Sequence, residues 1–186
     1  MDTVSDDTAG AGAARDDTVG DDTARDDTVG DDDLERAIAI ATRSHEGQRD
    51  KSGAAYIGHP LRVMAAVDGH DAKVVAVLHD VVEDSGVSLD DLRAEGFSET
   101  IVAAVDALTK RPGEPLEASM ARVVADPLAA RVKLADVADN SDAQRLAALP
   151  PETRARLLAK YRRTLELLTG AEQPATQPAE QEPGQP

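Results

Sequence analysis

Apolar residues recur at helical spacing through most of this chain. Leu34, Ile38 and Ala41 fall on one face of a first predicted helix, and the acidic run 31–33 supplies an N-cap and favourable charge at its start. Residues 71–84, with the sequence DAKVVAVLHDVVED, are apolar on most sides, which predicts one continuous helix in the centre of the fold. Because the alternation typical of strands is missing, the pattern predicts an all-α fold, a compact multi-helix bundle.

Proline predicts where three further helices begin, since it suits the first helical turn. These are a second helix over about 60–68, a helix that starts at Pro127, and a last helix from about 150 to 169. Shorter helices are predicted at about 88–94, 98–110 and 115–125.

The two ends of the chain differ from this helical part in composition. Residues 15–24 and 25–34 share eight of ten positions in an Asp-rich repeat, and the C-terminal segment is rich in Pro, Gln and Glu. Such polar, like-charged segments cannot bury an apolar face, so we expect disordered tails at 1–33 and 170–186 around one domain at 34–169. Of the net charge of −16, −10 falls in 1–33 and −3 in 170–186, which leaves −3 for the domain.

Composition narrows the function classes. An acidic chain argues against a nucleic-acid partner, because phosphate backbones bind to basic surfaces. The chain has no Cys, no recognisable signal peptide and no apolar run near the roughly 20 residues that span a bilayer. We therefore expect a soluble cytoplasmic protein without a membrane partner. The sequence does not decide whether it forms a homo-oligomer.

His79 and Asp80 are neighbours in the predicted central helix. Taken alone, such a pair is more often structural, with a core histidine bonded to a carbonyl group and an aspartate making a local bond. An ionised Asp80 in an apolar helix is costly, however, unless a cation or a hydrogen-bond donor compensates its charge. A metal ion bound by both side chains would provide that compensation.

Further candidate ligands lie on either side in the sequence. His59 precedes Pro60, which predicts a non-helical backbone at a helix N-cap, with the imidazole directed toward a neighbouring helix. Asp136 would complete a set of two histidines and two aspartates, a mixed nitrogen and oxygen site suited to Mn²⁺, Fe²⁺ or Zn²⁺. Asn140 follows Asp136 by four residues and so faces the same way.

Two more carboxylates accompany the central pair. Glu83 follows His79 by four residues and Asp84 follows Asp80 by four, so each is expected one turn along on the face of a candidate ligand. A carboxylate there can orient a water molecule or take its proton. The simpler interpretation is a solvated helix end. The full set of residues favours a metal-dependent phosphohydrolase.

Four segments of the chain, in order, resemble the hydrolase domain of the RelA/SpoT homologue family. They are GQRDKSGAAYIGHPLRVM, VLHDVVEDSGVSLDDL, VDALTK and RVKLADVADN. Members of this family belong to the HD superfamily and remove the 3′-pyrophosphate from the alarmone (p)ppGpp. The resemblance covers roughly residues 34–169. Since no residues remain for a synthetase or regulatory domain, it implies a stand-alone small alarmone hydrolase.

The resemblance also implies a role for particular residues. The metal would be Mn²⁺, with Fe²⁺ or Zn²⁺ as alternatives, bound by His59, His79, Asp80 and Asp136. The catalytic acids would be Glu83 and Asp84. The substrate contacts would be Lys51, Asn140 on the nucleoside, Tyr161 on the last helix, and Arg49.

One position departs from the family pattern. The family commonly has an Arg-Lys pair in the loop before the first histidine, where the Arg stacks on guanine, whereas this chain has Asp50-Lys51. An acid beside a polyanionic substrate is unfavourable, which leaves a second hypothesis open: an HD phosphohydrolase for another nucleotide, such as a nucleoside phosphate or NADPH. A third hypothesis is a non-catalytic alarmone-binding module, which a missing ligand or acid would favour.

Overall fold

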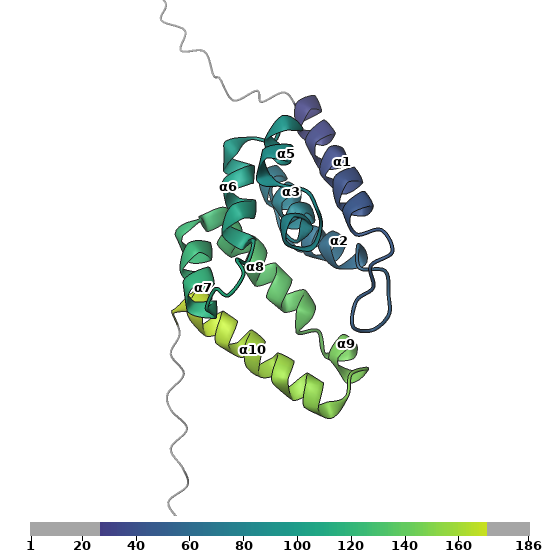
Figure 1. The fold of residues 1–186 in the computed structure, drawn as a ribbon, viewed down its shortest axis with the longest axis vertical. Coiled ribbons are helices and arrows are strands. Elements are labelled where there is room, and N and C mark those ends of the chain that lie inside the picture. The colour runs from purple at the N-terminus through teal and green to yellow at the C-terminus, as the bar shows by residue number, and fades with distance from the viewer. Residues whose placement is uncertain (1–26, 171–186) are drawn as a thin grey trace, which may run out of the picture.

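The structure, a computed structural model, describes residues 27–170, and these residues confirm the predicted all-α fold (Figure 1). Apart from an isolated bridge between Arg49 and Ala55, no strand pairing occurs within residues 27–170. The helices are α1 (Asp27–Ser44), α2 (Gly58–Ala65), α3 (His70–Leu78), α4 (Val81–Asp84), α5 (Leu89–Ala94), α6 (Glu99–Leu108), α7 (Leu116–Ala125), α8 (Pro127–Asn140), α9 (Ala143–Ala147) and α10 (Pro151–Thr169).

Helix α3 lies at the centre of the fold, packed against α1, α2, α6 and α8 (Figure 1). Its residues from Val74 to Leu78 are completely buried. With only one Phe and two Tyr in the chain, the main core consists chiefly of Val, Ala, Leu and Ile side chains. Burial of these side chains fixes the end of α3, from which two of the candidate ligands extend.

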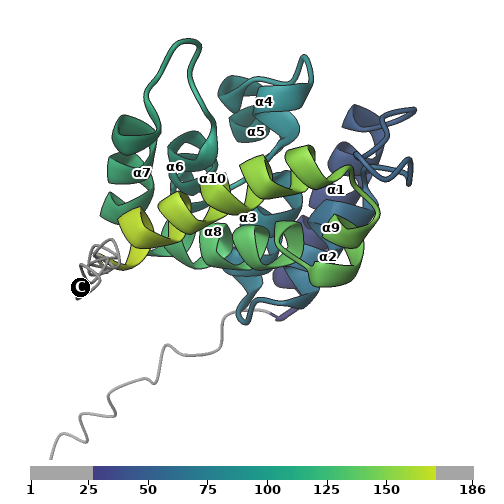
Figure 2. The same ribbon diagram turned by 90° about the horizontal axis from the view of Figure 1, so that it is seen from below.

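A second layer forms from the C-terminal helices. Helix α10 lies along α8, with α7 toward one end and α9 toward the other (Figure 2). Val137, Leu146, Leu157 and Tyr161 form a separate small apolar cluster between α8, α9 and α10. This layer faces the ends of α3 and α4, and the cavity described below lies between the two parts of the fold.

Local capping explains several of the helix boundaries. Asp126 caps α8 by accepting hydrogen bonds from the backbone of Leu128 and Ala129, and Pro127 occupies the first helical position. Ser88 and Asp91 form a reciprocal capping box at the start of α5. Gly69, with φ of 91°, allows the tight turn from α2 into α3.

The predicted single helix over 71–84 is wrong, because the chain breaks between α3 and α4. Asp80 has φ of −103° and ψ of −7°, outside the usual helical geometry, and α4 restarts at Val81. At this break, Nε2 of His79 lies 3.0 Å from Oδ2 of Asp80. Glu83 and Asp84 consequently lie on a separate short helix.

The predicted start of the second helix is also wrong. Helix α2 begins at Gly58, so His59 lies within its first turn and not before it. The following proline disfavours helical backbone at His59 but does not forbid it, and a first-turn proline removes no intrahelical hydrogen bond. Helix α9 was not predicted, and α1 begins upstream of the run 31–33.

The predicted tails lie largely outside the described residues, and the proposed domain bounds stay predictions. No helix within residues 27–170 combines the length and apolarity needed to cross a membrane.

Candidate metal centre

His79 occupies the break that follows α3 and is 2% exposed. Its Nδ1 atom donates a hydrogen bond of 2.7 Å to the carbonyl oxygen of Ala76. This is the carbonyl bond of a structural histidine, but it engages only one ring nitrogen. The Nε2 atom is buried and has no hydrogen-bond partner within the described part of the chain, and it lies 3.0 Å from Oδ2 of Asp80. His79 therefore presents a nitrogen suited to a metal ion.

His59 approaches the same point from α2 and is 4% exposed. Its Nδ1 atom donates a hydrogen bond of 2.7 Å to Oδ2 of Asp139 on α8. Its Nε2 atom lies 3.1 Å from Oδ1 of Asp136 and 3.8 Å from Oδ2 of Asp80. As in His79, the Nδ1 contact leaves Nε2 to face the cluster.

Three of the four predicted ligands form one group, with Asp80 beside it in contact with both histidines. One ligand atom from each of His59, His79 and Asp136 lies within 4.8 Å of the other two. Ligand atoms bound at about 2.1 Å in tetrahedral geometry lie about 3.4 Å apart, so the measured spacings of 3.0 to 3.8 Å suit a shared ion. Two imidazoles and carboxylate oxygens fit a divalent first-row metal, and the arrangement does not select among Mn²⁺, Fe²⁺ and Zn²⁺.

The electrostatics of the cluster also favour a cation. Burial opposes a charged His79, but the carboxylates of Asp80 and Asp136 outweigh this and raise the pKa of His79 to about 9. Burial alone would raise the pKa of Asp136, but Lys133 and the two histidines hold it far below its usual range. The cluster therefore attracts positive charge, which either a proton or a metal ion can supply.

Neighbouring side chains fix the two aspartates. The Tyr56 hydroxyl donates a hydrogen bond of 2.6 Å to Oδ2 of Asp80. The ammonium group of Lys133 lies 2.7 Å from Oδ2 of Asp136, and the Asn140 amide donates to Oδ1 at 2.5 Å. Asn140, predicted as a nucleoside contact, thus lines the cavity while also holding a candidate ligand.

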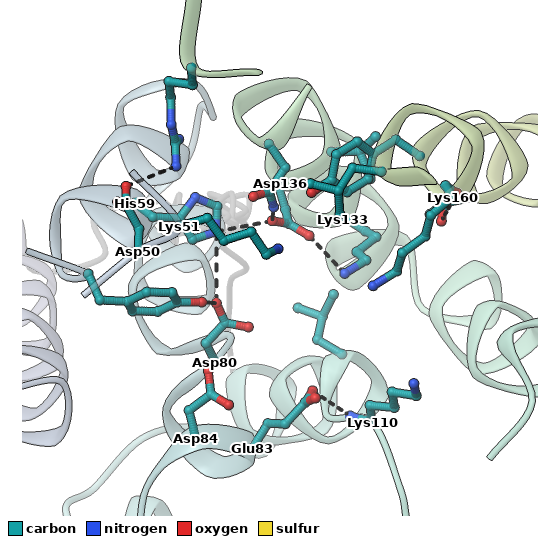
Figure 3. A pocket seen from close by; sticks show the side chains of 18 of the residues that line it. Asp50, Lys51, His59, Asp80, Glu83, Asp84, Lys110, Lys133, Asp136 and Lys160 are labelled. Carbon is teal, nitrogen blue, oxygen red and sulfur yellow. Dashed lines mark hydrogen bonds and ion pairs between the residues drawn. The ribbon is translucent and has the colours of Figure 1, made fainter. Parts of the chain in front are cut away.

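The two predicted catalytic acids lie on α4 at the edge of this cluster (Figure 3). Glu83 accepts a hydrogen bond of 3.1 Å from the backbone nitrogen of Lys110. Partial burial and the charges of Asp80 and Glu83 raise the pKa of Asp84 above its usual value. A carboxylate with a raised pKa is a better proton acceptor, so Asp84 suits general-base chemistry.

The cluster forms one wall of a cavity of about 420 Å³, a volume within the range of small-molecule sites. Lys51, Lys133 and Lys160 direct their ammonium groups toward the space in front of Asp136 (Figure 3). Burial and the nearby charges of Lys133, Lys110 and Lys51 lower the pKa of Lys160. Within residues 27–170 no carboxylate pairs with the side chain of Lys51, Lys110 or Lys160. Positively charged lysine side chains are therefore concentrated at this cavity, although the domain as a whole has a net negative charge.

The remaining wall is apolar and comes from the C-terminal helices. It includes Tyr161, the predicted contact on the last helix, together with Leu146, Leu149 and Leu157. Tyr161 is 9% exposed and belongs to the small apolar cluster between α8 and α10. A planar base could pack against such a wall.

The loop before α2 closes the cavity on another side. Oδ1 of Asp50 accepts hydrogen bonds from the backbone nitrogen of Ser52 at 2.9 Å, the Ser52 hydroxyl at 2.6 Å and the backbone nitrogen of Ala54 at 3.0 Å. Its Oδ2 atom lies 3.3 Å from Nη2 of Arg145. Asp50 is therefore a neutralised structural acid within this loop. Arg49 and Lys51 line the cavity beside it, and Arg49 also donates to the carbonyl of Gly53.

Sequence reasoning missed several residues of the site, namely Tyr56, Lys110, Lys133, Asp139, Arg145 and Lys160. Asp139 and Lys133 flank Asp136 by three residues on either side, so helical spacing could have identified both. Arg145 and Lys160 carried no such signal, because their approach depends on how α9 and α10 pack.

The chain is similar to proteins that make or break guanosine tetraphosphate, although no family model matches it. A GTP pyrophosphokinase of Streptomyces coelicolor is 38% identical over 147 residues, covering 72% of this chain and 17% of that protein. A bifunctional (p)ppGpp synthase/hydrolase RelA of Mycobacterium tuberculosis is 37% identical over 73% of this chain and 19% of that protein. A guanosine-3′,5′-bis(diphosphate) 3′-pyrophosphohydrolase of Haemophilus influenzae is 32% identical over 69% of this chain and 20% of that protein. The chain thus spans about a fifth of the length of these relatives.

A solved structure shares the fold. It belongs to a metazoan ortholog of SpoT that hydrolyzes ppGpp, and the TM-score is 0.62 over 74% of this chain and 86% of that chain. Sequence identity between the two is 22%, so this likeness concerns the fold. The sequence relatives show that the chain belongs to the RelA/SpoT homologue family, and its fold is that of the SpoT ortholog.

Proposed function

We propose that this domain is a metal-dependent phosphohydrolase that removes the 3′-pyrophosphate of (p)ppGpp and releases GDP or GTP. The observation that carries this proposal is the convergence of His59, His79 and Asp136 on one point, beside a cavity that several lysines line. Water would attack the phosphorus attached to the 3′ oxygen. The bond between that phosphorus and the 3′ oxygen would break, and the oxygen would leave as a hydroxyl group after gaining a proton.

The residues that would hold the metal are His59, His79, Asp80 and Asp136, and Mn²⁺ is the ion we propose. A bound divalent cation would polarise a phosphoryl oxygen and lower the pKa of water beside it. The chain's own contribution is the fixed orientation of the four side chains, which Ala76, Asp139, Tyr56 and Lys133 hold by hydrogen bonds or ion pairs.

We propose Asp84 as the group that takes the proton of the attacking water. Its raised pKa supports this role, since proton transfer is efficient when the pKa of the base approaches the working pH. Glu83, which precedes Asp84 on α4 and is anchored to the backbone of Lys110, would orient the same water.

The lysines would bind the phosphate groups, and the apolar wall would receive the nucleoside. Lys51, Lys110 and Lys160 come from three separate elements and line the same cavity. Fixed ammonium groups stabilise the charge that accumulates on phosphoryl oxygens during the reaction. Tyr161 would contact the nucleoside, as would Asn140 and Arg49 at the cavity rim.

Hydrolysis is preferred over pyrophosphate transfer on chemical grounds. The relatives carry names for both reactions, and the chain matches about a fifth of each, so a name given to the whole relative does not identify the activity of the matched part. Carboxylates beside a candidate metal site suit activation of water. All the predicted metal ligands and catalytic acids are present in the sequence, which argues against a non-catalytic alarmone-binding module.

Asp50 favours a second candidate substrate class, a nucleotide other than (p)ppGpp. This residue stands where the family commonly has an arginine, and its carboxylate is paired with Arg145. The guanine contact expected of that arginine is therefore not supplied by position 50. A nucleoside phosphate or NADPH is the alternative. Both (p)ppGpp and these alternative substrates are soluble nucleotides, and we propose that the protein acts on its substrate in the cytoplasm.

A product assay on a nucleotide panel tests the proposal. The purified chain would be incubated with Mn²⁺ and ppGpp, pppGpp, GTP or NADPH, and released phosphate and pyrophosphate would be quantified separately. We expect pyrophosphate from ppGpp and pppGpp, with GDP and GTP as the nucleotide products. Release of phosphate from NADPH, with ppGpp left intact, would favour the alternative substrate. No release from any nucleotide would favour a binding module.

A further inference from the structure

Asp139 lies outside the candidate ligand set, but its carboxylate contacts the candidate ligand His59 and two arginines. It follows Asp136 by three residues on α8, and its side chain is 12% exposed. It accepts hydrogen bonds from Nδ1 of His59 at 2.7 Å, from Nε of Arg62 at 2.6 Å and from a guanidinium nitrogen of Arg145. One carboxylate thus joins α2, α8 and α9.

Arg145 extends this connection to the loop before α2. While one of its nitrogens contacts Asp139, another lies 3.3 Å from Oδ2 of Asp50. The other oxygen of Asp50 holds Ser52 and Ala54 by three hydrogen bonds. A continuous series of polar contacts therefore runs from the imidazole of His59 to the loop that carries Lys51.

We propose that Asp139 is a positioning residue that holds His59 for metal binding, and that Arg145 ties the same carboxylate to the loop at 50–54. The inference rests on the metal assignment within the proposed function. Because a carboxylate can only accept a hydrogen bond, Asp139 fixes the proton of neutral His59 on Nδ1 and directs Nε2 toward the ion. Asp139 then holds both the candidate ligand His59 and, through Arg145, the loop at 50–54.

The charge balance around Asp139 supports this role. Two guanidinium groups, those of Arg62 and Arg145, lie against the Asp139 carboxylate and balance its negative charge. An ionised acceptor makes the imidazole a stronger metal ligand. The competing explanation is that Asp139 merely fastens α2 to α8 through Arg62.

Metal titration without substrate separates these explanations. The full chain, Asp139→Ala, Asp139→Asn, Arg62→Ala and the control Asp90→Ala would be titrated calorimetrically with Mn²⁺ alone and with Zn²⁺ alone. Asp90 is 91% exposed, so its substitution removes the same charge far from the cavity. We expect Asp139→Ala to lose about 10- to 100-fold in metal affinity, as removal of such a partner typically does.

The other variants make the test specific. Asp139→Asn keeps an acceptor atom and should lose less affinity than Asp139→Ala, whereas Arg62→Ala and Asp90→Ala should bind the metals within about twofold of the wild type. Wild-type affinity in Asp139→Ala would overturn the proposal, as would an equal loss in Arg62→Ala. Circular dichroism at the titration temperature verifies that each variant is folded. If Asp139→Ala does not fold, the isosteric Asp139→Asn decides: unchanged affinity overturns the proposal.

Hydrogen exchange tests the link through Arg145. Arg145→Ala should lose amide protection at Ser52 and Ala54, because Arg145 contacts Asp50 directly, while Arg62→Ala should keep it. Unchanged protection in Arg145→Ala would overturn the link. Neither measurement uses a nucleotide, so both remain decisive if the chain fails to hydrolyse ppGpp.

Discussion

The Tyr56 hydroxyl donates a hydrogen bond of 2.6 Å to Oδ2 of Asp80, the oxygen that also lies 3.0 Å from Nε2 of His79. Tyr56 precedes His59 by three residues, and its ring packs against the rings of His45 and His59 at 4.9 and 5.8 Å between centroids. One residue of the loop before α2 therefore orients a carboxylate that belongs to the break after α3. The candidate metal centre depends on this contact between distant segments.

Replacing Tyr56 by Phe should weaken metal binding without unfolding the protein. The ring contacts remain, but Asp80 loses a donor that fixes its orientation. A hydrogen bond to a charged group contributes about 1.5 kcal/mol or more, so we expect about a tenfold loss of Mn²⁺ affinity by calorimetric titration. Wild-type affinity in a folded Tyr56→Phe variant would mean that Asp80 is not oriented by this hydroxyl.

Metal affinity should rise with pH. In the protein without a metal ion the pKa of His79 is raised to about 9, so at neutral pH a proton occupies the cluster and must leave when the ion binds. Below about pH 9 the affinity should therefore increase by about tenfold per pH unit, with about one proton released per ion. Titration in buffers of different ionisation enthalpy measures the released proton. An affinity that is independent of pH would exclude His79 as a ligand.

Removal of the metal should lower thermal stability. An ion that binds only the folded chain stabilises it by an amount that grows with the ratio of free ion to Kd, about 2.7 kcal/mol at a hundredfold excess. We expect the Tm to fall after treatment with a chelator and to recover on addition of Mn²⁺. The Asp136→Asn variant serves as the control, since its Tm should respond weakly to either treatment. An equal response in that variant would indicate a site elsewhere.

Lys160→Ala should raise KM more than it lowers kcat, if this lysine mainly holds a phosphate group away from the reacting bond. The lost charge-assisted contact corresponds to about 1.4 kcal/mol, or about a tenfold rise in KM for ppGpp. Lys73→Ala is the matched control, because Lys73 lies on α3 and does not line the cavity. Equal KM values for Lys160→Ala and Lys73→Ala would remove Lys160 from the substrate site.

The sequence predicted the fold class because nearly every helix shows a clear apolar period or a proline or capping residue at its start. Pro127 and the cap at Asp126 are examples. It did not predict the break at His79 and Asp80, since VLHDVVED has a continuous apolar pattern and the break depends on tertiary contacts. His59 likewise lies inside α2 because packing against α8 outweighs the local preference created by Pro60.

The candidate ligands were predictable because histidines and acids are rare within apolar segments. Their supporting residues were less so. From the sequence, Asp50 could only be interpreted as an acid unfavourable for binding a polyanionic substrate. The structure shows that Arg145 on α9 balances its charge. Helix α9 has no strong apolar period that would have predicted it. Long-range ion pairs of this kind leave no local pattern in a single sequence.

The most direct test of the account compares the wild type with Asp80→Ala for ppGpp hydrolysis and for Mn²⁺ binding. In the wild type we expect Mn²⁺-dependent release of pyrophosphate and GDP, lost on chelation. In Asp80→Ala we expect both turnover and metal binding to disappear while the helical circular dichroism remains. Normal hydrolysis of ppGpp by a folded Asp80→Ala variant would contradict the metal centre proposed for this domain.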